Sequence, residues 1–302
     1  MAEYVSPRQV ARAIGVSESA VKRWCDRGLV PVVRTAGRHR RIPLSGVISY
    51  LRASGHSLVR PELLGLPPAT SAGPAVLERA VAPLLAAVRE HDEECVRRII
   101  VDLHLSAHSV AEIGDAVLAP AFEQVGELWE RGEMDVYQER HACDMCHRAL
   151  QALTGLLDAP RPDAPAAIGG GISGDPYTLA TRLVELVLRQ AGWRAMSLGH
   201  DLPPETIEKA IEHHRPRLVW LSVSAPLPEE QLRRSCESLA ARAGRHSGAL
   251  VVGGRESAAA DGSGGSRLGS LRELEALAAA ATQAADGSQY FGIAGSTTSA
   301  QA

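Results

Sequence analysis

Aromatic side chains are scarce in this chain, at 4% of 302 residues, and phenylalanine occurs twice, as Phe122 and Phe291. Alanine and leucine supply most of the apolar content, and this bias favours helices. The sequence lacks any run approaching the roughly 18 uninterrupted apolar residues of a membrane span. Its first residues also lack the basic leader and apolar core of a signal peptide. We therefore expect a protein that is neither embedded in a membrane nor exported.

Disulfide pairing is not expected either. The cysteines are odd in number and scattered along the chain, at Cys25, Cys95, Cys143, Cys146 and Cys236. Free thiols suit a reducing compartment, so the predicted location is the cytoplasm. The sequence shows no Ser/His/Asp set and no pair of carboxylates typical of hydrolytic chemistry, and we predict that the protein is not an enzyme.

Charge is distributed unevenly along the chain. Residues 1–60 contain eleven Lys/Arg and three Asp/Glu, which gives a local charge of +8. Because the whole chain carries −3, the remaining residues carry −11. A basic head on an acidic body indicates that the head contacts a polyanion and the body does not.

The basic head has the pattern of two short helices joined by a tight turn. Residues 6–14 begin with Ser-Pro, which favours a helix start because proline at the first helical position loses no hydrogen bond. Gly15 ends this helix, Ser17 caps the next one, and Gly28 ends that one. Two such helices form the skeleton of a helix-turn-helix.

The second of these helices has an apolar side and a basic side. We expect the core to take Ala20, Val21 and Trp24. Polar and cationic side chains are left facing outward, at Ser19, Lys22, Arg23 and Arg27. In a helix-turn-helix, the start of this helix reads base edges in the major groove while long cations reach phosphates. For this segment alone, the alternative is a solvated, charged helix face.

Residues 29–44 read as a strand, a tight Ala-Gly turn and a second strand. Their positive charge is concentrated around the turn, and a phosphate backbone is the anion that would neutralise it. Head and wing together give these predicted DNA-binding residues: Ser17, Ser19, Lys22, Arg23, Arg34, Arg38, His39, Arg40 and Arg41.

Residues 4–53 resemble the DNA-binding head of MerR-superfamily regulators, particularly the BldC-like branch with its Gly-Gly-His-Arg-Arg-Ile wing. The resemblance places Lys22 and Arg23 on the recognition helix and residues 38–41 on the wing. This chain departs from the pattern at Ala36-Gly37-Arg38, where the family has two glycines before the histidine. The resemblance implies a winged helix-turn-helix over residues 1–55. It further implies a double-stranded DNA operator as partner and a homo-oligomer matched to a two-fold site.

The body begins after a segment rich in Pro, Gly and Ser, which we interpret as a linker over residues 56–74. Four stretches with helical periodicity follow, at residues 75–91, 93–105, 109–131 and 136–157. Because short connections join them, we expect an antiparallel four-helix bundle over residues 75–158.

Residues 166–284 change to alternating strand and helix patterns, which predict a doubly wound, Rossmann-like α/β domain with a parallel sheet. Ligands of such sheets bind beyond the carboxyl ends of the strands. The Gly/Ser-rich residues 258–270 are expected to form a mobile flap or loop, and residues 285–302 a disordered tail. The predicted fold is therefore multidomain, with winged helix-turn-helix, bundle and α/β domain in that order.

The bundle sequence resembles the one that precedes the cobalamin-binding domain in methionine synthase and in light-responsive repressors of the CarH type. That family has Trp, nine residues, then Glu-His, with the Trp covering the upper face of the corrin. Trp129, Val136 and Glu139 match this pattern, but Arg140 stands at the histidine position. His141 follows one residue later, about 100° around a helix, and so does not replace it.

The α/β sequence resembles the cobalamin domain of the same family, whose signature is Asp-x-His-x-x-Gly, then a serine, then Gly-Gly. Here Ser222 and Gly253-Gly254 match the later positions. The first loop instead has Tyr177 where the family has its lower cobalt ligand, and Ala180 where it has the glycine that admits the nucleotide tail. A protonated phenol is a poor cobalt ligand compared with imidazole.

These departures predict a transcriptional regulator with a CarH-like sensory body that is cobalamin-independent or uses a different effector. Its site residues would be Trp129, Val136, Glu139, Arg140, Tyr177, Ser222, Gly253 and Gly254. Two alternatives remain open, a cobalamin-dependent light-responsive repressor and a corrinoid carrier in methyl transfer. An antirepressor protein is an alternative partner to a small-molecule effector.

A Cys-x-x-Cys-His sequence at Cys143, Cys146 and His147 has the spacing of a covalent haem attachment site. With His141 it would also supply four zinc ligands. Buried, unliganded thiols on a packed helix are the preferred interpretation, and no metal site is predicted.

Overall fold

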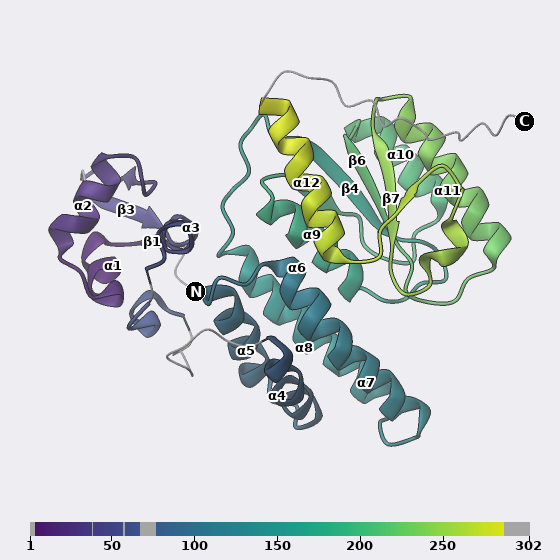
Figure 1. Ribbon diagram of the computed structural model, residues 1–302, viewed down its shortest axis with the longest axis horizontal. Helices are drawn as coiled ribbons and strands as arrows, with labels where there is room; N and C mark the ends of the chain where they lie inside the picture. Colours follow the sequence, from purple (N-terminus) through teal and green to yellow (C-terminus); the bar gives the residue numbers. More distant parts are fainter. Residues whose placement is uncertain (1–3, 38, 57, 67–76, 287–302) are drawn as a thin grey trace, which may run out of the picture.

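The computed structural model describes residues 4–37, 39–56, 58–66 and 77–286. The predicted wing residue Arg38, about half of the predicted linker and all but the first two residues of the predicted tail lie outside this part of the chain. A head, a helical region and an α/β domain follow one another along the sequence (Figure 1). None of the described helices is both long and apolar enough to cross a membrane.

The head is a winged helix-turn-helix. Its elements are β1 (Tyr4–Val5), α1 (Pro7–Ile14), α2 (Glu18–Asp26), β2 (Val33–Arg34), β3 (Arg40–Pro43) and α3 (Leu44–Ser54). Strands β2 and β3 form the expected antiparallel wing, with Arg34 opposite Arg40. Strand β1, which the sequence pattern did not indicate, pairs with the other edge of β3.

Local sequence signals account for the helix boundaries in the head. Ser6 and Gln9 form a capping box at the start of α1, and Gly15 ends that helix in the left-handed conformation with φ 83°. Ser17 caps α2 by accepting a hydrogen bond from the Ala20 amide at 3.2 Å.

Part of the predicted linker is packed onto the head. Residues Pro61–Leu64 form a 3₁₀ helix against α1, and Leu64 and Leu66 are buried. The amides of Val59 and Arg60 both donate to the Ala13 carbonyl, at 2.8 and 2.9 Å. The apolar Leu-Leu-Gly-Leu sequence explains the difference, because it supplies a buried surface that a flexible linker would leave in water.

The helical region contains α4 (Leu77–Arg89), α5 (Glu93–Leu105), α6 (Val110–Ile113), α7 (Ala119–Glu130) and α8 (Val136–Thr154). Helix α5 packs along α8, and α4 packs on α5, α7 and α8. The stretch expected as one helix over residues 109–131 is interrupted by a π-helical turn at Gly114–Leu118. Pro120 follows this turn and lacks the amide that would continue a regular α-helical ladder.

The α/β domain contains a five-stranded sheet in the order β5-β4-β6-β7-β8, and every pair in it is parallel. The strands are β4 (Ala166–Gly171), β5 (Arg194–Ser197), β6 (Leu218–Ser222), β7 (Ala249–Gly253) and β8 (Ser266–Arg267). In sequence order this is the flavodoxin-like 2-1-3-4-5 arrangement, whose topological switch point lies between the first and third strands. Here that point lies between β4 and β6.

Helices cover both faces of the sheet (Figure 1). Helices α9 (Leu179–Gln190) and α12 (Leu271–Asp286) lie on one face, and α10 (Pro204–His214) and α11 (Glu229–Gly244) on the other. The helical region packs against α9 through α6 and α8, and against α12 through α6. A single apolar cluster therefore extends from the head through the helical region to α9 and α12.

The Gly/Ser-rich segment is not the free loop that its composition predicts. It contains a short 3₁₀ helix, Ser257–Ala260, and the edge strand β8. The sheet explains this, because the open edge of β7 offers backbone groups that even a two-residue strand can satisfy.

Candidate DNA-binding surface and ligand cleft

Helix α2, the predicted recognition helix, has an exposed polar side and a buried apolar side. Val21 and Cys25 are buried, Ala20 and Trp24 are half-buried, and the side chains predicted to face outward are exposed: Ser19, Lys22, Arg23 and Arg27. Lys22 pairs with Glu18 at 2.7 Å one turn earlier. The hydrogen bond from Lys22 lowers the pKa of the Glu18 carboxyl below its usual value.

The wing carries its cations next to this helix. Arg34, His39 and Arg41 are exposed. Arg40 is half-buried because its guanidinium forms an ion pair with Asp26 of α2 at 2.6 Å. Arg40 therefore fastens the wing to the recognition helix, and Arg41 is the more available of the two for an external anion.

An aromatic group behind the recognition helix was not predicted. The rings of Trp24 and Tyr50 have centroids 4.7 Å apart, and His56 lies edge-on to Trp24 at 5.7 Å. Trp24 thus connects α2 with α3 instead of filling the centre of the head core. Sequence periodicity assigned Trp24 to the buried side, but it could not identify Tyr50 and His56 as its partners.

At the switch point, the loop after β4 is organised by Asp175, which is fully buried. One oxygen of its carboxylate accepts a hydrogen bond from the Tyr177 amide at 3.0 Å, and the other from the Ser224 amide at 2.5 Å. Asp175 therefore connects the loop after β4 with the loop after β6. Asp175 stands at the aspartate of the cobalamin-domain signature, but the sequence pattern did not predict that it joins these two loops.

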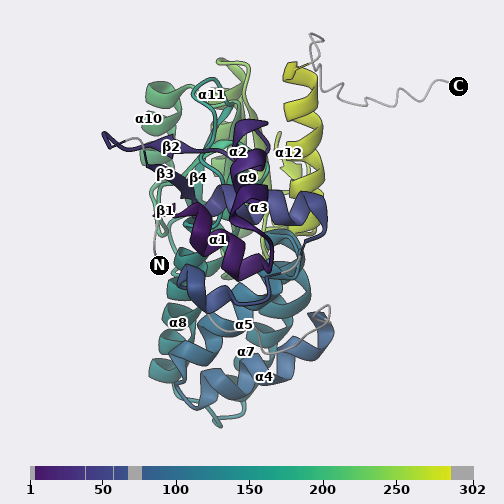
Figure 2. The ribbon, with the colours of Figure 1, turned by 90° about the vertical axis from the view of Figure 1, so that its left-hand side faces the viewer.

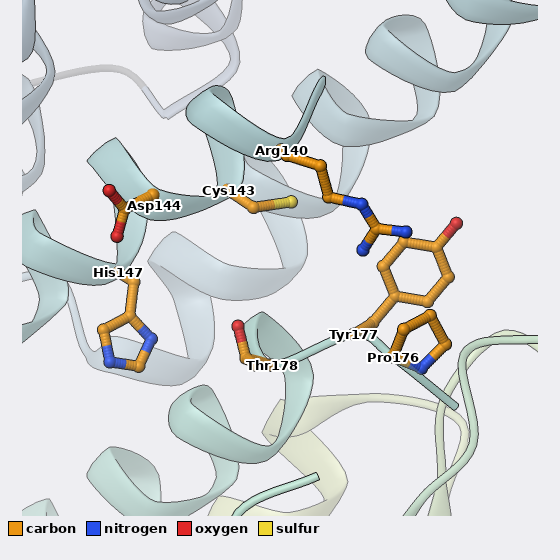
Figure 3. A pocket seen from close by; sticks show the side chains of 7 residues that line it. All are labelled: Arg140, Cys143, Asp144, His147, Pro176, Tyr177 and Thr178. Atoms are coloured by element: carbon orange, nitrogen blue, oxygen red, sulfur yellow. The ribbon is translucent and has the colours of Figure 1, made fainter. Parts of the chain in front are cut away.

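Tyr177 and Arg140 meet across the space between the α/β domain and α8. The guanidinium carbon of Arg140 lies 5.5 Å from the centre of the Tyr177 ring, within the range of a cation–π contact (Figure 3). Arg140 also pairs with Glu139 at 3.4 Å. Arg140 and Tyr177 line a cleft of about 340 Å³. Its full lining is Arg140, Cys143, Asp144, His147, Pro176, Tyr177 and Thr178.

The remaining predicted ligand residues are not among those that line this cleft. Trp129 lies at the end of α7 and Val136 at the start of α8, and each is about half exposed (50% and 48%). Ser222 is buried at the end of β6. Gly254 has φ 110°, and a Cβ there would lie 2.3 Å from the Val223 carbonyl, so this glycine permits a close approach of two loops.

The four side chains of the Cys-x-x-Cys-His region point in different directions. The ring of His141 lies 5.1 Å from that of His91, Cys143 and His147 line the cleft, and Cys146 is fully buried. Burial raises the pKa of both the Cys143 and the Cys146 thiol to about 12. Burial also lowers the pKa of His147. In the described part of the chain, no group of three or more His, Cys, Asp or Glu side chains is arranged to hold a metal ion.

Two protein families match this chain. The helix-turn-helix domain matches residues 4–55, and the B12 binding domain matches residues 81–154. This chain combines a helix-turn-helix domain with a B12-binding domain. The helical region described above is thus the B12-binding match, and the head is the helix-turn-helix match.

Two relatives of this chain are transcriptional repressors by name. The HTH-type transcriptional repressor CarA of Myxococcus xanthus is 25% identical over 74% of this chain and 78% of its own length. The HTH-type transcriptional repressor CarH of the same organism is 30% identical over 47% of this chain and 46% of its own length.

A solved structure extends the likeness of fold to the α/β domain. The monomethylamine corrinoid protein of Methanosarcina barkeri matches 68% of this chain and all of its own, with a TM-score of 0.54 and 20% identity. At this identity the likeness concerns the fold alone. It supports a helical region followed by a Rossmann-like parallel sheet.

Proposed function

We propose that the protein is a DNA-binding transcriptional regulator whose body responds to a ligand or partner. The observation that carries this proposal is the exposed basic surface of α2 and the wing on a domain of the helix-turn-helix family. The names of these two relatives support a role in repression. An operator of double-stranded DNA, a homo-oligomeric state and a cytoplasmic location belong to the same proposal.

The head would bind DNA with two groups of residues. Ser19 and Lys22 lie in the first half of α2, which in this class of domain enters the major groove and reads base edges. Arg34 and Arg41 on the wing would contact phosphates, which position the protein without reading sequence. Because the helix and wing are joined by the Arg40–Asp26 ion pair, both groups should bind as one rigid unit.

The wing is tested by measuring affinity for duplex DNA against salt concentration. Arg41→Ala should weaken binding to every sequence and lower the salt slope by about 0.9 for one lost phosphate contact. Lys22→Ala should change the preferred sequence in a binding selection. Arg234→Ala is the matched control, because this exposed arginine lies on α11, on the far face of the sheet. If Arg41→Ala behaves like the control in the titration, the wing does not contact DNA.

The residues at the carboxyl edge of the sheet do not fit a cobalamin held by histidine. Tyr177 offers a phenol at the position of the lower ligand, and its ring is covered by Arg140. Both oxygens of Asp175 accept backbone amides. We therefore assign the cleft to a different effector or to a partner protein.

A corrinoid carrier is the second candidate function, favoured by the likeness of fold to a monomethylamine corrinoid protein. Such a carrier needs an imidazole on the metal, and the basic head would have no purpose in it. The helix-turn-helix match therefore favours the regulator.

A further inference from the structure

The head contacts the body through the last turn of α3, where Arg52 reaches the end of α5. Nη1 of Arg52 donates to the carbonyls of His104 and His108 at 2.8 and 3.0 Å. Nη2 donates to the carbonyl of Ala107 at 3.1 Å. One guanidinium thus holds three carbonyl oxygens of another domain.

The end of α5 is shaped to present these oxygens. Ala107 adopts the left-handed conformation with φ 72°, which is unfavourable for a residue with a side chain. This turn lets the His108 amide donate back to the Leu103 carbonyl at 3.2 Å and directs the last carbonyls away from the helix. The carboxyl end of a helix carries partial negative charge, so a cation is favoured there.

The contact is only partly open to water. Burial lowers the pKa of Arg52, and the carboxylates of Glu112 and Glu275 act in the opposite direction. A second contact lies one turn earlier on α3, where the Ser49 hydroxyl donates to Asp158. Because Asp158 lies between α8 and β4, the head is fastened at two separate places on the body.

This docking leaves the DNA-binding surface free. In Figure 1 the helix α3 lies on the side of the head toward the body, and α2 lies on the far side. Seen from the head, in Figure 2, α1, α2 and the wing lie in front of the body. Arg52 therefore fixes the direction in which the recognition helix points, and its contacts involve no residue of the DNA-binding surface.

We propose that Arg52 is a positioning residue for DNA binding, which fixes the head on the body and so sets the half-site spacing that the oligomer accepts. The inference rests on the proposed function, because it requires two heads on one two-fold site. Heads held rigidly on paired bodies can reach only half-sites about one helical turn apart, 10–10.5 base pairs, or multiples of it. Heads released from the body would reach other spacings as well.

The test is a series of operators in which one to ten base pairs are inserted between half-sites selected with the full-length protein. The parent should bind best at one spacing and lose affinity steeply when half a turn is inserted. Arg52→Ala should reduce this preference at least about tenfold, because three charge-assisted hydrogen bonds are lost. Its affinity for a single half-site should be unchanged, which also shows that the head remains folded.

Two further variants separate position from structure. Arg97→Ala is the matched control, since Arg97 lies on α5 and pairs within that helix with Glu94 at 2.5 Å. It should keep the spacing profile of the parent. Arg52→Lys keeps the charge but lacks the fork that spans several carbonyls, and should recover part of the preference.

The outcomes are distinguishable. A parent without spacing preference, or Arg52→Ala with the profile of the parent, would overturn the inference. An equal change in Arg97→Ala would do so too. A parent that binds no duplex DNA would overturn the proposed function instead.

Discussion

His104 lies beside Arg52 at the head–body junction. Its exposed fraction is 1%, which is low for a titratable side chain. Its Nδ1 lies 3.3 Å from Nη1 of Arg52, and since an arginine can only donate, the imidazole must accept through that nitrogen. Burial and the Arg52 charge together lower the pKa of His104 to about 3, against an opposing hydrogen bond with the His108 backbone. The junction therefore contains a neutral histidine at physiological pH.

This depressed pKa predicts sensitivity to acid. An unfolded chain takes up the proton near pH 6.5 and the folded chain only near pH 3, so protonation favours the unfolded state. The contribution of His104 to the free energy of unfolding is complete above pH 6.5. It falls by up to about 1.4 kcal/mol per pH unit as the pH drops from 6.5 toward 3. His104→Gln should flatten the pH dependence of urea unfolding between pH 6.5 and 5, where carboxylates contribute little.

His213→Gln is the control for this measurement, because His213 is exposed on α10. It should leave the pH dependence as in the parent. Equal pH dependence in His104→Gln and the parent would show that His104 does not carry the acid sensitivity.

Helix α3 packs against the turn that precedes the wing so closely that a glycine is required. A Cβ on Gly46 would lie 2.2 Å from Cγ of Pro31, a rigid ring atom. Gly46→Ala should therefore lower the free energy of unfolding of the head by about 1–3 kcal/mol, despite the better helix propensity of alanine. Thermal unfolding followed by circular dichroism measures the change.

Gly126→Ala in α7 is the matched substitution, because a Cβ there meets no atom within 4 Å. It should raise stability by up to about 1 kcal/mol through helix propensity alone. The same sign of change in both variants would contradict the close packing of α3 on Pro31.

At the scale of elements, the sequence predicts what depends on local signals. Ser6, Gly15 and Ser17 set the ends of α1 and α2, and the change of periodicity after residue 158 separates helical region from sheet. The π turn was not foreseen because the apolar pattern continues through it. Strand β8 has no strand pattern of its own and depends on the edge of β7.

The same distinction holds for the sites. The cationic residues of the wing are contiguous in sequence and could be predicted from it, whereas Arg52 meets its acceptors 52 to 56 residues away. Nothing in the sequence around Arg52 differs from an ordinary basic residue near a helix end. The contact between Arg140 and Tyr177 could be anticipated only because the family motifs placed both residues near one ligand.

At the scale of the molecule, a double variant in the cleft between α8 and the sheet can test whether substitutions at two signature positions removed histidine ligation of cobalt. The variant Tyr177→His with Ala180→Gly restores the two signature positions of the first loop. We expect it to give adenosylcobalamin a visible absorption spectrum altered by imidazole ligation, while the parent does not. The parent is itself the control, and a histidine-ligated spectrum in the parent would contradict the assignment of the cleft to another ligand.

The buried carboxylate of Asp175 has a consequence for any molecule that enters this cleft. Because it holds the amides of Tyr177 and Ser224, the loops on both sides of the switch point acquire their order when the protein folds. A ligand then loses little conformational entropy in arranging them, and even a few contacts can give useful affinity. The edge of the sheet is thus preorganised for ligand binding.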